Sequence, residues 1–334
     1  MSLMFLTDLH LDNYRPFSKI LANGMNTRLL DQFDVIRKVA SCIENEHPEA
    51  VLFLGDMFNG TTESLPKIIY NAGFLTVQAW SKVAPLYILV GNHDIYRGMH
   101  VLSTFETLPN VHIISHTTKI KLGNYEVDLI PWGDTPPEER GDICAGHLEV
   151  YGAMMDAAYA CKGGIQPTSF FGYKYVLLGH FHNPQDFVVP GCQCARYIGS
   201  IMQTDRRRSS EGLMGITMLE NDGTLKSFPI SSPRIYDVVL DTEEAMEKFI
   251  QEILDPENYF KVTITNASLN FPSDLDRVSV EYDLPAISTS RLIMPENAGG
   301  TWNELLATAV ELYIDQTNTV LDKKTLKTLA KELL

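Results

Sequence analysis

The chain has 334 residues, of which 45% are hydrophobic and 21% charged, a composition typical of a globular protein with a substantial core. Its net charge of -15 argues against a protein that holds nucleic acid unaided through a basic face. No apolar run is long enough to cross a bilayer, and Asp8 interrupts the apolar N-terminus too early for a secretory signal, so we expect a cytoplasmic protein.

The first part of the chain alternates short apolar runs with amphipathic segments. Residues 4–7, 50–54 and 86–90 predict buried strands, whereas residues 27–46 and 64–82 carry apolar side chains at helical spacing. This order favours parallel strands joined by right-handed crossovers, and therefore the α/β class.

After residue 110 the sequence pattern changes from alternating strands and helices to mostly short strands. Between residues 111 and 130 we expect short strands with a hairpin turn at Gly123-Asn124, and residues 151–161 are predicted to be helical. Strands follow at 143–145, 175–178, 187–189, 196–198, 212–219 and 224–230. We expect the last four to build the second sheet of a two-sheet core.

Two turn-rich stretches suggest domain boundaries. Ser231-Ser232-Pro233 is expected to end a large domain of residues 1–232, and a small α+β domain of residues 233–296 follows. A link at Asn297 leads into a C-terminal segment of residues 297–334, whose apolar residues are spaced for two helices.

Polar side chains come directly after five of the predicted strands, often beside a glycine that allows a tight turn. Carboxyl ends of parallel strands are where open α/β sheets place their ligands. Carboxylate, amide and imidazole groups are ligands that manganese, iron and zinc accept. The residues are Asp8, His10, Asp56, Asn92, His147, His180 and His182.

Such a set suits the hydrolysis of a phosphodiester. That reaction needs charge neutralised on the nonbridging oxygens and a hydroxide available near neutral pH. Two divalent ions roughly 3.5 to 4 Å apart meet both needs, and a carboxylate that reaches both ions is the natural bridge between them.

The motifs resemble the calcineurin-like metallophosphoesterase superfamily in their order: Asp8-x-His10, Gly55-Asp56, Gly91-Asn92-His93-Asp94, Gly146-His147 and Gly179-His180-Phe181-His182. The resemblance implies a four-layer α/β/β/α sandwich with a small α+β capping domain and C-terminal helices. More narrowly, the chain is similar to SbcD-type nuclease subunits of double-strand-break repair complexes, above all to the recombination endonuclease subunit of large tailed phages. Ile130-Pro131-Trp132, Gly146-His147-Leu148-Glu149 and Tyr197-Ile198-Gly199-Ser200 support this narrower match.

This resemblance also implies roles for single residues. One metal, most simply manganese, would be held by Asp8, His10, Asp56 and His182, and Asp56 would bridge to a second held by Asn92, His147 and His180. His93 would act on the phosphate as general acid or as transition-state stabiliser. Asp94 would orient the His93 ring. Water would attack in line, without a covalent intermediate.

The implied activity is that of a DNA exonuclease and endonuclease in repair or recombination, in the cytoplasm of a bacterium or of a phage-infected host. Its implied partners are DNA, an SbcC-type coiled-coil ATPase and a second copy of the chain. The C-terminal helices would either grip the coiled coil or pack on their own domain. No membrane is implied.

Two details bear on DNA. Arg206, Arg207 and Arg208 form the one dense basic run, which is either a solvated turn or a contact to the phosphate backbone beside the metals. Asn59 stands where many related repair nucleases carry histidine or aspartate, and it leaves the balance of endonuclease and exonuclease activity open.

Two other functions compete with the nuclease. A phosphomonoesterase or protein phosphatase of the same superfamily is disfavoured because the Asp-Arg-Gly pattern of the phosphoprotein enzymes is absent after Asp56, and Asp94 stands where they carry glutamate. A metal-bound scaffold without catalysis is disfavoured by the complete ligand set and by His93.

Overall fold

The computed structural model describes residues 2–22, 24–60, 65–155, 159–204, 214–255, 257–266, 268–272, 275, 277–283, 310–311, 314–315 and 322–333. The chain divides into two compact units. The first comprises residues 1–264 and 268–281, and the second comprises residues 265–267 and 282–334.

A six-stranded sheet forms the centre of the first unit. Its strands lie in the order β14-β13-β1-β2-β3-β6, where the neighbours from β1 to β6 run parallel and β13 and β14 run antiparallel. The bounds are β1 Leu3–Leu6, β2 Ala50–Phe53, β3 Leu86–Leu89, β6 Val111–Ile114, β13 Gly215–Leu219 and β14 Leu225–Pro229. The pairing of β1, β2, β3 and β6 confirms the predicted parallel strands.

The placement of β13 and β14 corrects one expectation, because both strands extend the first sheet rather than the second. Strand β13 pairs with β1 through Met4 and Met218, and all five of its residues are buried. A strand that is apolar on both faces needs cover on both sides, and the position beside β1 provides it.

The second sheet also has six strands, in the order β11-β12-β10-β9-β8-β7. Its bounds are β7 Thr118–Leu122, β8 Tyr125–Ile130, β9 Ile143–His147, β10 Tyr175–Gly179, β11 Gln185–Asp186 and β12 Cys194–Tyr197. The predicted hairpin at Gly123-Asn124 is confirmed, since Leu122 pairs with Tyr125 across it. Strands β8, β9, β10 and β12 run parallel to their neighbours in this set.

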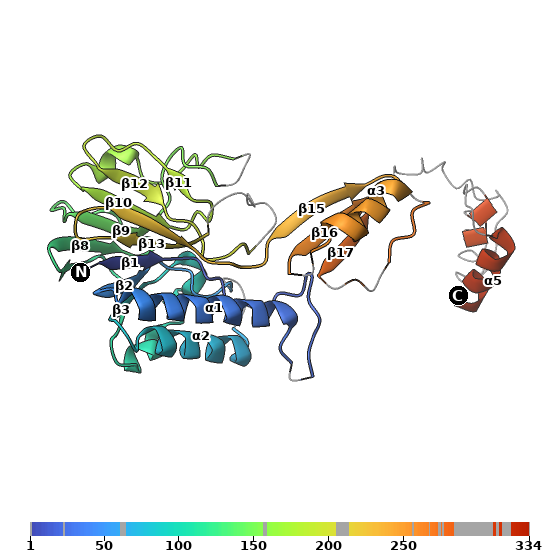
Figure 1. The fold of residues 1–334 in the computed structure, drawn as a ribbon, viewed down its shortest axis with the longest axis horizontal. Helices are drawn as coiled ribbons and strands as arrows, with labels where there is room; N and C mark the ends of the chain where they lie inside the picture. Colours follow the sequence, from blue (N-terminus) through green and yellow to red (C-terminus); the bar gives the residue numbers. More distant parts are fainter. Residues whose placement is uncertain are drawn as a thin grey trace. The chain divides into compact units, whose positions relative to one another are not determined.

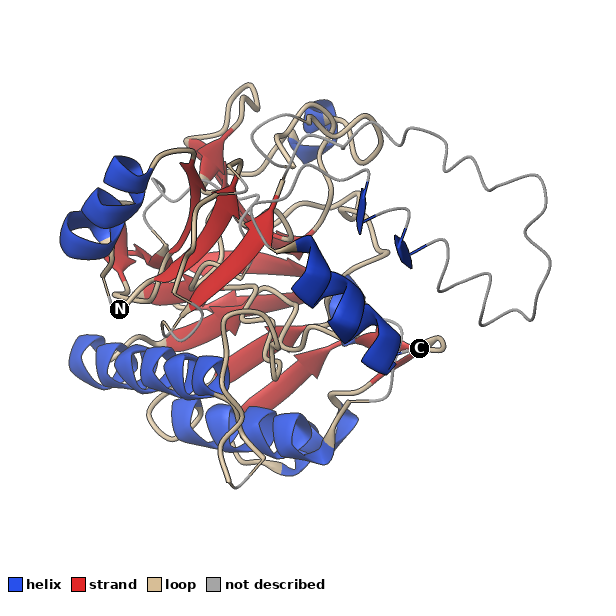
Figure 2. Ribbon diagram, turned by 90° about the vertical axis from the view of Figure 1, so that its right-hand side faces the viewer, coloured by secondary structure: helices blue, strands red, loops and turns tan. Residues whose placement is uncertain are grey.

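The two sheets stack face to face, and two helices cover the other face of the first sheet (Figures 1 and 2). These helices are α1, Thr27–Glu46, which matches its predicted bounds, and α2, Lys67–Trp80. Strand β1 shows why the layers form: Leu3 and Phe5 pack between the sheets, whereas Met4 and Leu6 point to the helices. Side chains that alternate in this way bury a strand on both faces.

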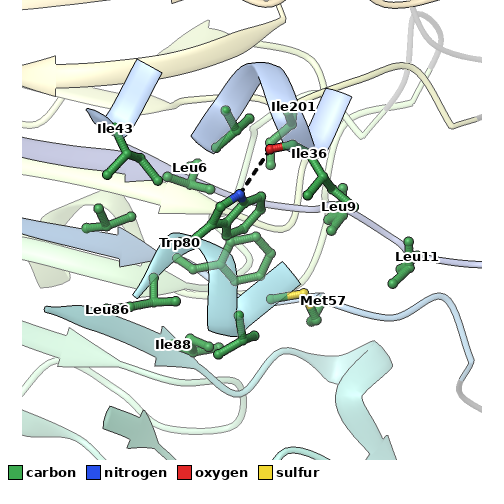
Figure 3. Close-up of a cluster of buried hydrophobic side chains, with 14 of the residues drawn as sticks. Leu6, Leu9, Leu11, Ile36, Ile43, Met57, Trp80, Leu86, Ile88 and Ile201 are labelled. Atoms are coloured by element: carbon green, nitrogen blue, oxygen red, sulfur yellow. Dashed lines mark hydrogen bonds between the residues drawn. The ribbon is translucent and has the colours of Figure 1, made fainter. Parts of the chain in front are cut away.

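Trp80 is the largest fully buried side chain of the helix-covered core. Figure 3 shows its indole between Leu6, Leu86 and the helices, with the ring nitrogen donating a hydrogen bond of 3.2 Å to the carbonyl of Ile36 on α1. That bond satisfies the only polar atom of a ring that is otherwise in hydrocarbon contact, and it ties α1 to α2.

The predicted helix at residues 151–161 is wrong for the part that is described. Val150 pairs with Ile165, and Met154 pairs with Ala160 in an isolated antiparallel bridge. Gly152 lies at φ +84°, a conformation that does not continue a right-handed helix. Loops and the short helix η3, Pro167–Phe170, therefore supply the side chains packed against the outer face of the second sheet.

A smaller sheet of three strands belongs to the same unit. Its order is β15-β16-β17, with β15 and β16 parallel, and helical turns connect these two strands as expected. The bounds are β15 Ile235–Leu240, α3 Glu243–Lys248, η4 Phe249–Ile253, β16 Tyr259–Ile264 and β17 Val278–Tyr282. Phe249 and Phe260 centre its separate apolar core.

In the second unit, helix α5 spans Lys323–Leu333, close to the predicted 323–334. Most of the other predicted tail helix, 302–315, lies outside the described residues, although residues 310–311 and 314–315 are helical. In the described part of the chain, no helix is both long and apolar enough to cross a membrane.

Candidate metal centre

The carboxyl ends of β1, β2 and β3 in the first sheet meet those of β9 and β10 in the second. The polar residues that follow these strands are thereby brought together, although they are spread over 175 positions from Asp8 to His182. All seven predicted metal ligands, Asp8, His10, Asp56, Asn92, His147, His180 and His182, take part in one network of short contacts.

The backbone at these strand ends is unusual. Asp8, His10, Asp56 and His180 have φ angles of +53°, +46°, +58° and +92°, in the region that side chains other than glycine seldom adopt. Such conformations cost of order 1–3 kcal/mol each and concentrate at functional sites. Gly91 is needed for space, because a Cβ atom there would lie 2.2 Å from Asp56 Oδ1.

Three side chains define what we call the first half-site: Asp8, His10 and His182. The Nε2 atoms of His10 and His182 are 2.9 Å apart, and they lie 3.6 Å and 3.4 Å from Asp8 Oδ1. Two ligands about 2.1 Å from one ion are separated by roughly 3.0 Å in octahedral and 3.4 Å in tetrahedral geometry. The three atoms are therefore spaced as ligands of a single ion.

Asn92, His147 and His180 define the second half-site. Asn92 Oδ1 lies 3.0 Å from His147 Nε2 and 3.0 Å from His180 Nδ1. The ring of His147 is anchored from behind, because its Nδ1 lies 2.6 Å from the carbonyl oxygen of Leu54 and donates to it. In the neutral ring that binds a metal, this bond leaves the Nε2 lone pair directed at the half-site.

Asp56 joins the two half-sites. Its Oδ2 lies 3.5 Å from His10 Nε2 and 3.4 Å from His147 Nε2, while its Oδ1 accepts a 2.8 Å hydrogen bond from the backbone N–H of His93. One carboxylate oxygen thus faces the ligand atoms of both half-sites. This is the arrangement expected of a carboxylate that bridges two metal ions.

The charge distribution suits a cation. Burial would raise the pKa of Asp8, but the contact with the His10 ring and the attraction of His147 hold it below its ordinary value. The pKa of Asp56 is also lowered, since His147 outweighs the effect of burial. For His147, burial opposes the charged ring, yet the attraction of Asp56 raises its pKa to about 9. Both carboxylates therefore favour the ionised form that binds a cation.

One buried atom tests directly whether a metal fits. Asp8 is fully buried, and no hydrogen-bond donor among the described residues satisfies its Oδ1. The other oxygen of Asp8 accepts from Thr7 Oγ1 at 2.7 Å and from the N–H of His180 at 3.0 Å. A buried carboxylate oxygen rarely lacks a partner, and a divalent cation held with His10 and His182 would supply one.

His93 lies beside both Asp56 and the first half-site. Its ring meets the ring of His10 edge to face, with centroids 4.6 Å apart, and one ligand-type atom each of His93, His10 and Asp56 lies within 4.8 Å of the others. Nδ1 of His93 lies 3.1 Å from the backbone carbonyl of Asn59. Burial lowers the pKa of His93, which favours the neutral ring.

The orienting role expected of Asp94 belongs to another group. Asp94 is buried and accepts backbone hydrogen bonds from Asp56, Phe58 and Gly91 at 3.0, 3.2 and 3.0 Å. Burial and the nearby charge of Asp56 raise its pKa to about 7. The His93 ring is oriented by the Asn59 carbonyl, so Asp94 instead fixes the loops that carry Asp56 and His93.

Two side chains near the second half-site were noted in the sequence only as family matches. Trp132 packs against His180 with ring centroids 4.9 Å apart and the rings tilted by 35°, and Glu149 Oε1 lies 3.1 Å from His180 Nε2. The spacing His147-x-Glu149 could have predicted that Glu149 lies near the half-site, because alternate residues of an extended segment point to the same side. Arg206, Arg207 and Arg208 lie outside the described residues.

Comparison with known proteins identifies the family. The chain is 23% identical over 265 residues to the "Putative phosphoesterase 244L" of Invertebrate iridescent virus 6, which spans 72% of this chain and 88% of the viral protein. The crystal structure of TT1561 of Thermus thermophilus superposes with a TM-score of 0.43 and 10% identity, covering 69% of this chain and 99% of that one. The sequence model of the family Calcineurin-like phosphoesterase matches residues 1–184, more than half of the chain and every proposed ligand. The chain therefore belongs to the calcineurin-like phosphoesterase family, whose members are metal-dependent phosphoester hydrolases.

Proposed function

We propose that this protein is a two-metal phosphodiesterase that cleaves DNA. The observation that carries the proposal is the position of Asp56 Oδ2, within 3.5 Å of an imidazole nitrogen in each half-site. A single buried oxygen shared in this way supports a paired-ion centre rather than two separate sites. Manganese is the first ion to test, because the ligands are oxygens and imidazole nitrogens without thiolate.

The donor set also favours a phosphate ester as substrate. With the histidine rings neutral, as metal binding requires, the charged ligands would be Asp8 and the shared Asp56, so two divalent ions would bring four positive charges against two negative ones. The remaining positive charge attracts the nonbridging oxygens of a phosphodiester. When bound, the ions supply Lewis acidity and lower the pKa of water near phosphorus.

His93 completes the proposed reaction. Its Nδ1–H donates to the Asn59 carbonyl, so Nε2 is the ring atom that takes up or gives a proton on the side of the substrate. In the protonated state it would stabilise charge on the phosphate and protonate the leaving oxygen. Asp94 keeps His93 in place indirectly, through the backbone of Gly91 and Asp56.

DNA is proposed as the substrate because of the similarity to SbcD-type nuclease subunits. The chain is strongly acidic, so we further propose that an SbcC-type ATPase, and a second copy of the chain, provide much of the grip on DNA. Arg206, Arg207 and Arg208 would add local contacts to phosphate, and the tail that contains α5 would bind the ATPase. The alternative, a phosphomonoesterase, is favoured by the same acidic charge.

A cleavage assay with manganese distinguishes these functions. We expect hydrolysis of linear duplex DNA, a single-stranded circle and a chromogenic phosphodiester, and much slower hydrolysis of a chromogenic phosphomonoester. Asp56→Asn should remove the activity, whereas Glu138→Gln, a matched change at an exposed carboxylate, should not. Fast hydrolysis of the monoester with intact DNA would support the alternative.

A further inference from the structure

The imidazole of His180 is engaged at both of its nitrogens. Nδ1 lies 3.0 Å from Asn92 Oδ1, inside the second half-site, and Nε2 lies 3.1 Å from Glu149 Oε1, on the outer side. A neutral imidazole has a single N–H, and a carboxylate can only accept. The Glu149 contact therefore places the proton on Nε2 and leaves the Nδ1 lone pair facing the half-site.

The other tautomer would disable this half-site. With the proton on Nδ1, His180 would donate to Asn92 Oδ1 across the same 3.0 Å, and that bond would occupy two ligand atoms at once. The other side chains of the half-site do not decide between the two tautomers, because Asn92 Oδ1 can also accept a hydrogen bond from His180 Nδ1. The choice between the tautomers is therefore made on the outer face of the ring, where Glu149 lies.

The geometry around Glu149 is well defined. Its backbone carbonyl accepts a 2.8 Å hydrogen bond from Ile165, and Gly164 packs so closely that a Cβ there would lie 2.6 Å from that carbonyl oxygen. Trp132 restrains the face of His180 at a centroid distance of 4.9 Å. The side chains of His180 and Glu149 are 14% and 33% exposed, so their contact is partly shielded from water.

We propose that Glu149 is a positioning residue that selects the Nδ1-ligating tautomer of His180 and thereby strengthens metal binding at the second half-site. The inference rests on the proposed two-metal function. It assigns Glu149 no contact with substrate. A carboxylate behind a histidine ligand fixes the tautomer and makes the ring a better donor, and its loss typically costs 10–100-fold in metal affinity.

The first test needs no metal. In the metal-free protein, long-range ¹H–¹⁵N spectra of histidine rings report which nitrogen carries the proton. We expect His180 to be protonated at Nε2 in the wild type and in Glu149→Gln, whose amide oxygen can still accept, and to shift toward Nδ1 in Glu149→Ala. An unchanged His180 spectrum in Glu149→Ala overturns the proposal.

The second test is a titration with manganese alone, in which electron paramagnetic resonance measures the concentration of the free ion. Glu149→Ala should weaken one of the two binding steps by about 10–100-fold and leave the other unchanged. Glu149→Gln should recover part of that loss, and Glu138→Ala should match the wild type. Manganese quenching of Trp132 fluorescence, isolated by comparison with Trp132→Phe, should shift to higher concentration together with the weakened step.

The inference is overturned if Glu149→Ala binds manganese as tightly as the wild type. It is also overturned if Glu149→Ala loses manganese affinity equally in both binding steps and melts at a lower temperature, because Glu149 would then only support the loop. If Glu149→Ala fails to fold, the titration of Glu149→Gln decides: weaker manganese binding in one step than in the wild type supports the proposal, and equal binding in both steps overturns it. A protein with the expected binding pattern that cleaves no phosphodiester would overturn the proposed function and leave this inference standing.

Discussion

The two half-sites would each hold a metal ion by different means. In the first, Asp8 and the shared Asp56 bring two carboxylates, but the outer faces of the histidines are loosely held: among the described residues His10 Nδ1 has no hydrogen-bond partner, and His182 Nδ1 lies 3.4 Å from Thr204 Oγ1. In the second, Asp56 brings its carboxylate to the ligand atoms, while His147 and His180 are anchored by a backbone carbonyl and by Glu149.

This difference suggests a division between charge and orientation. Where two carboxylates face an ion, the Coulomb attraction in a buried site is large and tolerates some freedom of the rings. Where neutral ligands predominate, affinity depends on presenting each lone pair in the correct direction, so hydrogen bonds behind the ligands matter more. Substitutions of Asp56, His93, Asp94 and Thr204 test this contrast in turn.

Asp56→Asn should have the largest effect, because the residue belongs to both half-sites. The amide can still accept from His93 through Oδ1, so the loop is preserved, but a neutral NH₂ group replaces the oxygen that faces His10 and His147. We expect the hydrolysis rate to fall by at least ~10³-fold, about 4 kcal/mol, and both manganese-binding steps to weaken. Calorimetric titration beside the rate assay checks this. Loss of only one step would show that Asp56 does not bridge.

His93→Gln should come next and should leave both half-sites intact. His93 lies beside the ligands but is proposed to act on substrate, so we expect kcat for a chromogenic phosphodiester to fall by roughly 10²-fold with unchanged manganese binding. His116→Gln, the same change at an exposed ring, is the control. Weaker manganese binding in His93→Gln would instead assign His93 to the first half-site as a ligand.

Asp94→Asn tests the backbone hydrogen bonds that hold the loops next to both half-sites in place. Its two oxygens accept three backbone N–H groups, and an amide would turn an NH₂ group toward one of these donors. Leaving a buried donor unsatisfied costs about 1–3 kcal/mol, so the urea midpoint of the metal-free protein should fall accordingly. Glu106→Gln, at an exposed position of the short helix η2 (Ser103–Thr107), should show no change. Equal midpoints for the two variants would contradict the framing role.

The sequence was sufficient to predict that the seven candidate ligands converge, but not which groups hold their side chains in place. Asp8, Asn92 and His180 were predictable because a polar residue after an apolar strand has few reasons to be there, and parallel strands bring such ends together. The carbonyls of Leu54 and Asn59 were not, since every residue has a carbonyl and its direction depends on the finished fold. Orientation is therefore harder to foresee than composition.

The same limit explains the two errors in the fold. Helical spacing at residues 151–161 was a local pattern, but pairing of Val150 with Ile165 closed that segment into a loop. Strand β13 was recognised as a strand, yet its partner β1 lies more than 200 positions away in the sequence. Local periodicity predicts the element, whereas the choice of neighbour is made by long-range burial.

Thr204→Val should have the smallest effect and sharpens the contrast most directly. Oγ1 of Thr204 contacts His182 Nδ1 at 3.4 Å, at the outer limit of a hydrogen bond, and valine keeps the shape of the side chain without the hydroxyl. The backbone carbonyl of Thr204, which accepts from Arg28, is untouched. Because Asp8 and Asp56 supply attraction through charge, we expect manganese affinity of the first half-site to change by less than about threefold. A titration beside Glu149→Ala compares the outer contacts of the two half-sites directly, and a tenfold loss in Thr204→Val would show that orientation governs both.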